Sequence, residues 1–210
     1  MIARPSTAEL LAAELRREIL DGAPAAGERL RERELVERYG VARHTLRAAL
    51  RQLAGEGLVR IEPHRGATVA HLGPEDVRWL YELRAALELE AAHLALERYE
   101  GRLPASVHAA LAALEGACAG TDPSWSEVSH AHAALHGAIV AASESPRIVA
   151  AHAALTGELL LFLLQLHPHL EPVRLAADHA ALVADLERDG AGVLRDHLRE
   201  SAETLGASVR

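Results

Sequence analysis

Residues 31–53 read RERELVERYGVARHTLRAALRQL, and this stretch decides the fold of the first part of the chain. The apolar residues that follow Arg43 recur at helical spacing and therefore share one face: Leu46, Ala49, Leu50 and Leu53. Three arginines stand four residues apart on another face: Arg43, Arg47 and Arg51. The stretch predicts a helix with an apolar back and a cationic front.

A second, shorter helix is predicted just before this one. Leu35, Val36 and Tyr39 mark its apolar side, and Gly40 supplies the left-handed conformation at which helices commonly end. Two helices joined by a turn of three or four residues make a helix-turn-helix. Arginine suits its exposed front, because the planar guanidinium donates two hydrogen bonds to a phosphate or to the O6 and N7 edge of guanine.

The sequence GLVRIEPHRGATV at residues 57–69 predicts a small β-wing after the helices. Residues 57–61 alternate as a strand, residues 63–66 have turn chemistry, and residues 67–69 return as a second strand. An arginine stripe on an arbitrary helix is more often a solvated face than a binding surface. The glycine turn and the wing favour a DNA-binding module here.

Charge supports a division into two modules, at residues 1–70 and 71–210. The first part has 12 arginines and 10 acidic residues, a net charge of +2, whereas the second has 10 arginines and 20 acidic residues, a net charge of −10. The overall charge of −8 does not exclude DNA binding, because contacts within a Debye length of about 8 Å respond to the local field.

The second module is predicted to be all-α, with prolines at helix starts. Six helices are expected, at residues 74–99, 104–114, 123–142 with Asp122 as cap, 146–167, 172–189 and from Gly190 to near Gly206. Short links between them imply an antiparallel helical bundle. The fold class is therefore mainly α, with an amino-terminal winged helix-turn-helix and a carboxy-terminal bundle.

Compartment is indicated by cysteine and by hydropathy. Cys118 is the only cysteine, so an intrachain disulfide is impossible and a reducing compartment is expected. No signal peptide opens the chain, and the apolar run 159–164 is far shorter than the roughly 20 residues that cross a bilayer. We expect a cytoplasmic protein without a membrane partner, in which this run is a buried helix.

Histidines form the second candidate site. His132 and His136 are four residues apart on an apolar stripe, and His179 and His197 each lie beside leucines at helical spacing. A single histidine on such a stripe is more often a hydrogen-bonded core residue than a ligand. Four of them on three helices favour a divalent metal, zinc or nickel first, since neutral imidazole is a common ligand for these ions.

Residues 9–69 resemble the amino-terminal domain of GntR-type bacterial transcription regulators. The pattern consists of ILDG at residues 19–22, GV-x-R-x-x-x-R at residues 40–47, and EGLV at residues 56–59 followed by a wing glycine. The resemblance implies operator DNA contacts from Arg33, Arg43, His44, Thr45, Arg47, His64, Arg65 and Gly66. Ala42 replaces the usual serine or threonine cap, a loss of ~1 kcal/mol, and His44 replaces the usual threonine.

Residues 76–200 resemble the FCD effector domain of the FadR branch, with VRWLYELRAALELEAAHLA at residues 77–95 similar to its first helix. The resemblance implies a metal held by His132, His136, His179 and His197, where His132 replaces a usual aspartate. His197 lies about one turn earlier than the usual last ligand, whose position is Ser201, and His152 is a spare candidate. Arg84, one turn before Glu88, either forms an ordinary ion pair or binds effector.

Together these features predict a ligand-responsive repressor, not an enzyme, which binds an inverted-repeat operator as a homodimer. The expected effector is a small organic or sugar acid whose oxygens complete the coordination of the metal. Two alternatives stay open: a metal-dependent hydrolase with a DNA-binding head, and a metal-free dimerisation bundle. Asp178 is the one carboxylate that the sequence places beside the histidines as a general base for the hydrolase.

Overall fold

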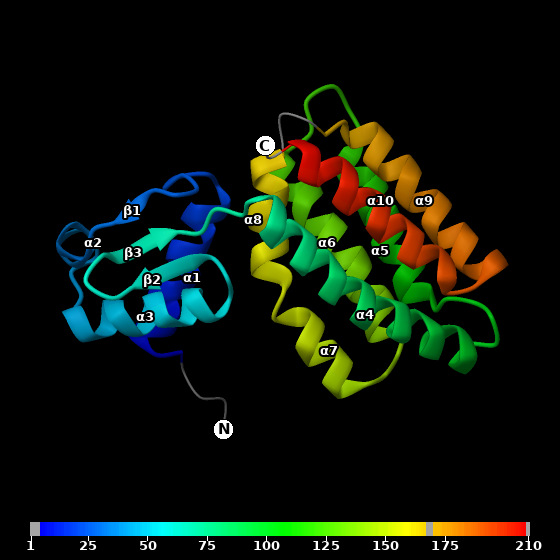
Figure 1. Cartoon of the computed structure of the whole chain (residues 1–210), viewed down its shortest axis with the longest axis horizontal. Coiled ribbons are helices and arrows are strands. Elements are labelled where there is room, and N and C mark those ends of the chain that lie inside the picture. Colours follow the sequence, from blue (N-terminus) through cyan, green and yellow to red (C-terminus); the bar gives the residue numbers. More distant parts are fainter. Residues whose placement is uncertain (1–4, 167–169, 209–210) are drawn as a thin grey trace. The chain divides into compact units, whose positions relative to one another are not determined.

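The computed structural model describes residues 5–166 and 170–208, and the chain divides into two compact units, Met1–His71 and Leu72–Arg210 (Figure 1). Each unit has its own apolar core. The first combines three helices with a small sheet, and the second consists of helices throughout its described part.

The helices of the first unit are α1 (Thr7–Leu20), α2 (Glu32–Tyr39) and α3 (Arg43–Gly55). Ser6 begins α1 with a capping box, in which its hydroxyl accepts from the Glu9 backbone and the Glu9 carboxylate accepts from the Ser6 backbone. Helix α1 packs on α3, and their apolar faces form the core of the unit. The largest fully buried members are Leu15, Ile19, Leu46, Leu50 and Leu53.

The connection between α2 and α3 has the predicted form. Gly40 ends α2 with φ 62°, a left-handed conformation that favours glycine. Ala42 is the N-cap of α3 and provides no side-chain hydrogen bond there, as its methyl group requires. The buried residues of α3 are the four that the sequence pattern indicated: Leu46, Ala49, Leu50 and Leu53.

The wing is a three-stranded antiparallel sheet in the order β1-β3-β2. Strands β2 (Val59–Glu62) and β3 (Gly66–Val69) form the expected hairpin. The sequence did not indicate β1 (Arg29–Leu30), which pairs with Ala67 and Thr68 of β3. Two residues are too short for a periodic signal, and only long-range pairing makes them a strand.

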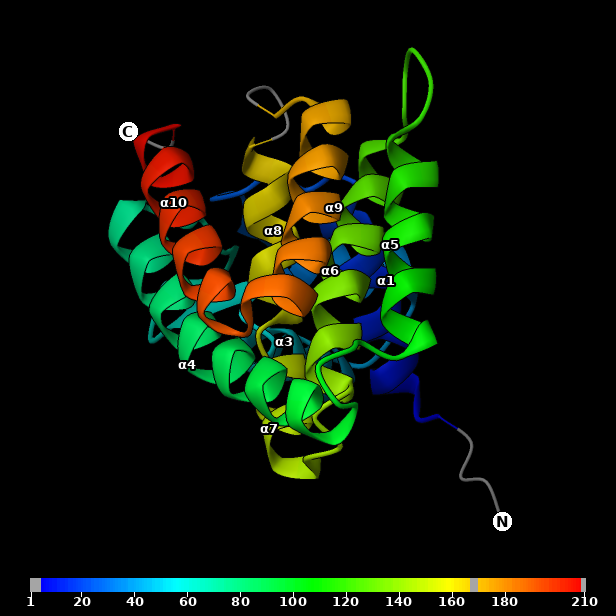
Figure 2. The same cartoon turned by 90° about the vertical axis from the view of Figure 1, so that its right-hand side faces the viewer.

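The second unit is a helical bundle (Figure 2). Its helices are α4 (Pro74–Arg98), α5 (Ala105–Cys118), α6 (Trp125–Ala141), α7 (Pro146–Ala153), α8 (Thr156–Leu166), α9 (Pro172–Asp189) and α10 (Gly192–Ser208). Helix α10 lies against α4 and α9, and α6 packs against α4, α5 and α8. Helix α6 thus lies in the middle of the bundle, between α4, α5 and α8.

Three helix boundaries differ from the expectation. The single helix expected over 146–167 is two helices, α7 and α8, bent by 41°, because α7 packs on α4 through His152 whereas α8 lays its leucines on α6. Helix α5 continues to Cys118, since Leu114 and Cys118 lie one turn apart on its buried face. Helix α6 is capped by Ser124, whose hydroxyl accepts from the Glu127 backbone, and not by Asp122.

The apolar run in α8 is buried as expected, from Leu159 through Leu163. Among the described residues, no single helix has the length and apolarity of a membrane span. The bent pair α7 and α8, taken together, has the length and apolar composition of such a span, and only length and composition indicate this.

Candidate functional site

The residues expected to contact DNA lie on α2, α3 and the wing of the first unit. All but one are exposed, and Thr45 is half-buried: Arg33, Arg43, His44, Thr45, Arg47, His64, Arg65 and Gly66. The wing turn places His64 at φ 63° and Gly66 at φ 87°. Cationic side chains on α3 and at the wing are therefore available to a phosphate or a base edge.

Arg47 is held by a carboxylate that the sequence reasoning missed. Its Nε donates to both carboxylate oxygens of Glu32 on α2, at 3.0 and 3.1 Å. This bond raises the pKa of Arg47 above its ordinary value. The side chains stay 59% and 33% exposed, so the pair is hydrated and open to exchange with another anion. Both bonds use Nε, which leaves Nη1 and Nη2 outside the pair.

The second unit brings the predicted histidines together. His132 and His136 on α6, His179 on α9 and His197 on α10 form one group, called here the histidine cluster. Ring centroids are 4.6 Å apart for His132 and His179, and 4.8 Å apart for His179 and His197. Four imidazoles from three helices therefore meet at one place.

Three members of this cluster form a tighter set. One ring nitrogen from each of His132, His136 and His179 lies within 4.8 Å of the others, and these three residues are called the histidine triad. The Nε2 atoms of His136 and His179 are 3.2 Å apart. Two nitrogens bound at about 2.0–2.1 Å to one tetrahedral ion stand about 3.3 Å apart, so this spacing fits a shared metal. His197 lies next to the triad but outside that set.

Hydrogen bonds at the opposite ring nitrogens determine which atoms of the triad are free. His136 Nδ1 lies 2.7 Å from Glu88 Oε2, and His179 Nδ1 lies 2.7 Å from the Leu175 carbonyl oxygen. Both partners are acceptors, so each Nδ1 carries the proton and each Nε2 has a lone pair. Two lone pairs then face one another at 3.2 Å. A bound cation would turn this repulsion into coordination.

Burial keeps the imidazoles neutral, which is the form that binds metals. The pKa of His132, and likewise of His179, lies well below its ordinary value, because burial penalises the charged form and neighbouring imidazoles add to the penalty. Burial lowers the pKa of His136 less, since Glu88 opposes it. Burial lowers the pKa of His197 to about 3. Within the part of the chain that the structure describes, His132 Nδ1 is buried without a hydrogen-bond partner, so the residues present fit a metal ion.

Glu88 is the centre of the buried polar network behind the triad. Its side chain is fully buried, and it accepts from His136, from Arg84 Nε at 2.7 Å and from His152 Nε2 at 3.1 Å. Spacing in the sequence links Glu88 only to Arg84, one turn away, whereas the fold also brings it against His136. His152 contacts Glu88 rather than the triad.

Arg84 forms the predicted pair with Glu88, but in the core of the unit and not on its surface. Its side chain is 1% exposed, and its guanidinium lies over the Tyr81 ring, 4.8 Å from the centroid. Its Nη2 is buried and has no hydrogen-bond partner within the described residues. Arg84 does not line the pocket beside the histidine cluster, so an effector contact from it stays a prediction.

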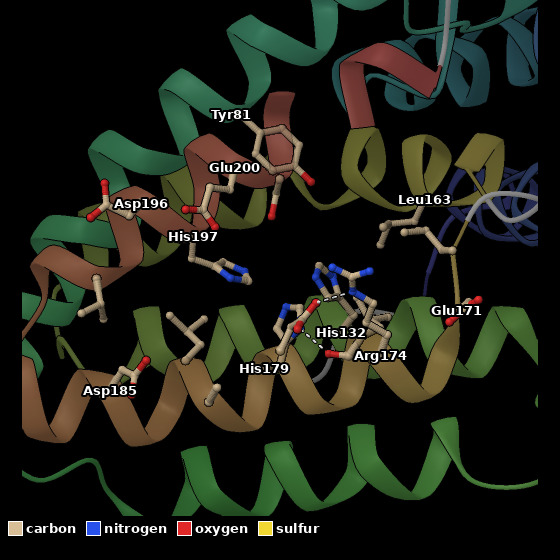
Figure 3. A pocket seen from close by; sticks show the side chains of 17 residues that line it. Tyr81, His132, Leu163, Glu171, Arg174, His179, Asp185, Asp196, His197 and Glu200 are labelled. Atoms are coloured by element: carbon tan, nitrogen blue, oxygen red, sulfur yellow. Dashed lines mark hydrogen bonds and ion pairs between the residues drawn. The ribbon is translucent and has the colours of Figure 1, made fainter. Parts of the chain in front are cut away.

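An open pocket of about 730 Å³ adjoins the cluster (Figure 3). His132, His179, His197 and Ser201 line it, together with Tyr81 of α4 and Leu163 of α8. Its volume lies within the range of about 300–1,000 Å³ that is typical of small-molecule sites. The pocket therefore gives a small ligand access to the imidazoles.

Comparisons with known proteins agree with both units. The model of bacterial regulatory proteins of the gntR family matches residues 7–69, and the FCD domain model matches residues 79–203. The transcriptional repressor GlaR of Escherichia coli (strain K12) is 33% identical over 131 residues, which cover 60% of this chain and 59% of GlaR. YdhC of Bacillus subtilis (strain 168), an uncharacterised HTH-type transcriptional regulator, is 32% identical over 84 residues, 40% of this chain and 38% of YdhC. The chain therefore spans less than two thirds of each.

Solved structures extend the likeness over nearly the whole chain. A crystal structure from Rhodococcus sp. RHA1, described as that of a transcriptional regulator GntR, has a TM-score of 0.79 at 26% identity and covers 98% of this chain and 100% of that one. E. coli McbR/YncC, at 21% identity and a TM-score of 0.74, covers 99% of this chain and 100% of its own and shows the same fold. The chain belongs to the GntR family of bacterial regulatory proteins, a family of DNA-binding transcription regulators and not of enzymes, and carries an FCD domain in its second unit.

Proposed function

We propose that this protein is a ligand-responsive transcriptional repressor of the cytoplasm. A homodimer binds an inverted-repeat operator, since the two-fold symmetry of a dimer matches a palindromic site. Recognition comes from the exposed face of α3, with Arg43 and Arg47, and from the wing. The exposure of these arginines supports this role, because their guanidinium groups are accessible to a phosphate or to a guanine edge.

The histidine triad, joined by His197, would hold a divalent metal. The single observation that carries this step is the pair of Nε2 atoms, on His136 and His179, that face one another at 3.2 Å with their Nδ1 atoms engaged elsewhere. An all-nitrogen donor set favours zinc or nickel over magnesium or calcium, which prefer oxygen. When bound, the ion supplies a Lewis-acidic position for oxygen ligands.

A small organic or sugar acid is the proposed effector. Its oxygens would complete the coordination of the metal, and Arg174, which lines the pocket, would pair with its charge. Arg174 is now 3.8 Å from Asp178, and both side chains are largely exposed, so this ion pair is weak and easily exchanged.

The link from the pocket towards the DNA-binding unit would run through α8. Leu163 of α8 lines the pocket, and two residues later Gln165 bonds both backbone groups of Leu72, its Oε1 accepting from the Leu72 nitrogen at 3.1 Å. Leu72 is the first residue of the second unit. A ligand that shifts α8 would thus shift the segment that leads to the first unit, and it acts only through its different affinities for the two arrangements.

Metal binding is tested with His136→Ala and a matched control, His130→Ala. His130 is exposed on the same helix and lies six residues away. His136→Ala should lose metal affinity by more than the ~10- to 100-fold that loss of an outer hydrogen-bond partner costs, whereas His130→Ala should keep it. The readouts are metal content of the purified protein and competition with a chromogenic chelator. Equal affinity of both variants, or no affinity in the wild type, would leave the metal-free dimerisation bundle.

Effector binding is tested with a thermal-shift panel of carboxylic acids, with and without a chelator. An acid present at 100 times its Kd should stabilise the metal-loaded protein by about 2.7 kcal/mol, and much less after chelation. Each acid that binds is then added to an operator-binding assay, in which it should weaken the complex. Acids that stabilise equally after metal removal would contradict metal-assisted sensing.

A further inference from the structure

The wall of the pocket that α9 and α10 form is strongly acidic. Among the described residues, five carboxylates line it and Arg174 is the one arginine that does so. These carboxylates are Glu171, Asp178, Asp185, Asp196 and Glu200. An effector with negative charge alone would enter against this field.

Three of the five carboxylates are already paired with an arginine of their own helix. Asp185 lies 2.6 Å from Arg188, Asp196 lies 3.0 Å from Arg199, and Asp178 faces Arg174. Their charges are thus partly compensated by the protein itself, and a ligand that pairs with them must compete.

Glu171 and Glu200 have no ion pair within the described part of the chain, and their positions differ. Glu171 is the N-cap of α9, where the helix dipole favours a negative charge. Glu200 lies within α10, three residues after His197, and so shares a helix face with it. Of the five, Glu200 is the carboxylate without a local counter-charge.

The inner end of the same pocket has the opposite character. His132 lines it and is 5% exposed, and its Nδ1 has no hydrogen-bond partner among the described residues, so this atom is available to a ligand. The buried guanidinium of Arg84 acts on His132 electrostatically, and its Nη2 has no hydrogen-bond partner among the described residues. A metal on the triad would add further positive charge. The pocket is then positive inside and negative at α10, with room in its 730 Å³ for a molecule that spans both ends.

We infer that the effector is zwitterionic: its acid group reaches the metal, and a protonated amine pairs with Glu200. This inference rests on the proposed function and narrows its effector class from organic acids to amino acids and related amino-carboxylates. Glu200 is the residue that sets the preference, because it stands on the same face as His197 and has no ion pair with any described residue.

The experiment compares three probes of equal chain length on the full-length, metal-loaded protein by calorimetry at low salt. They are pentanoate, its ω-amino derivative and glutarate, whose far ends are neutral, cationic and anionic. The amino derivative should bind best and glutarate worst. The preference of amino derivative over pentanoate should reach about fivefold, the upper end for an ion pair open to water, and should shrink at high salt.

A pair of variants locates the preference. Glu200→Gln should bring the amino derivative and pentanoate to equal affinity and should improve glutarate. Glu203→Gln is the matched control, because it also removes one negative charge, from an exposed residue of the same helix that does not line the pocket. The order of the three probes should not change in this control.

Two outcomes would overturn the inference separately from the proposed function. If glutarate binds the metal-loaded protein as tightly as the amino derivative, or if both variants change the preference equally, the zwitterionic class is wrong while metal-assisted binding stands. If no probe binds with or without metal, and the wider acid panel also fails, the proposed function fails with it.

Discussion

Arg47 on α3 and Arg84 on α4 are each paired with a glutamate, yet the two pairs differ in nearly everything else. Arg47 and Glu32 are hydrated, with 59% and 33% of their side chains exposed, whereas Arg84 and Glu88 are 1% and 0% exposed. Because Coulomb attraction between exposed charges in water is weak, a DNA phosphate can replace Glu32 as the partner of Arg47. The Arg84–Glu88 pair is shielded from water, so neither residue can exchange its partner for solvent.

The difference between the two pairs indicates which functional residues also determine the stability of the fold. On α3 the arginines stand clear of the apolar core, so their replacement should change DNA binding and barely touch stability. In the second unit the polar network of Arg84, Glu88, His136 and His152 is part of the core. Changing it should alter stability and the histidine triad together.

The largest effect is expected from Glu88→Ala. The change strands the Arg84 charge in the interior and removes the acceptor of His136, so the free energy of unfolding should fall by about 3–5 kcal/mol in urea titrations. Glu90→Ala, exposed on the same helix, is the control and should change it by less than about 0.5 kcal/mol. A loss for Glu88→Ala as small as for Glu90→Ala would mean that the buried pair contributes no more than a surface pair.

Arg47→Ala should weaken specific operator binding by about 1–3 kcal/mol if this arginine reads a base, with little change in unfolding. Arg51→Ala, exposed one turn further along α3, should weaken binding to all sequences about equally. The measurement is affinity for operator and for unrelated DNA at fixed salt. Unchanged operator affinity for Arg47→Ala would remove it from the interface.

Lowering the pH should destabilise the metal-free protein through the histidine cluster. Each histidine whose pKa is lowered in the folded state is protonated at a higher pH in the unfolded state than in the folded state. Protonation therefore favours unfolding, and stability is lost as the pH falls below 6.5. One such proton changes the unfolding free energy by about 1.4 kcal/mol per pH unit. For His197 the loss extends down to the folded pKa of about 3.

His197→Gln checks this pH dependence. Between pH 6.5 and about 3, the free energy of unfolding of the variant should depend less steeply on pH, by the equivalent of up to one proton taken up on unfolding. His130→Gln, exposed on α6, is the control for the substitution itself. Identical slopes for wild type and His197→Gln in urea titrations would show that the His197 proton is not linked to folding.

The smallest effect should come from Glu32→Gln, which removes the partner of Arg47. An exposed ion pair contributes about 0.2–1 kcal/mol, so unfolding should change little. Affinity for unrelated DNA should rise slightly, because one negative charge beside the arginines is gone. Glu34→Gln, which breaks the exposed pair with Arg31, is the matched control. A preference for operator that falls only in Glu32→Gln would make Glu32 a positioning residue for Arg47.

Sequence reasoning reached furthest where the signal is local. The buried face of α3, the left-handed Gly40 and the hairpin all follow from spacing over a few residues. The same reasoning grouped the histidines, because His132 and His136 share a helix face and the others lie beside leucines. It could not predict that His132, His136 and His179 lie closer together than His197 does, because distances between helices do not appear in a spacing pattern.

Features that depend on distant partners were beyond it. Glu88 and His136 are 48 residues apart, so nothing in the sequence near either one marks their bond. Strand β1 exists only through its pairing with β3, and the bend between α7 and α8 has no proline. The role of Glu32 likewise depends on a contact across 15 residues with the next helix. Each of these was missed for the same reason.

The opposed Nε2 atoms of His136 and His179 have a consequence for physiology. A regulator that takes its effector only through an ion bound between them would respond to two chemical supplies at once. An abundant effector alone would then leave the expression of the regulated genes unchanged in a cell starved of transition metal. The 3.2 Å spacing of these two Nε2 atoms would thus make the response depend on both the metal and the effector.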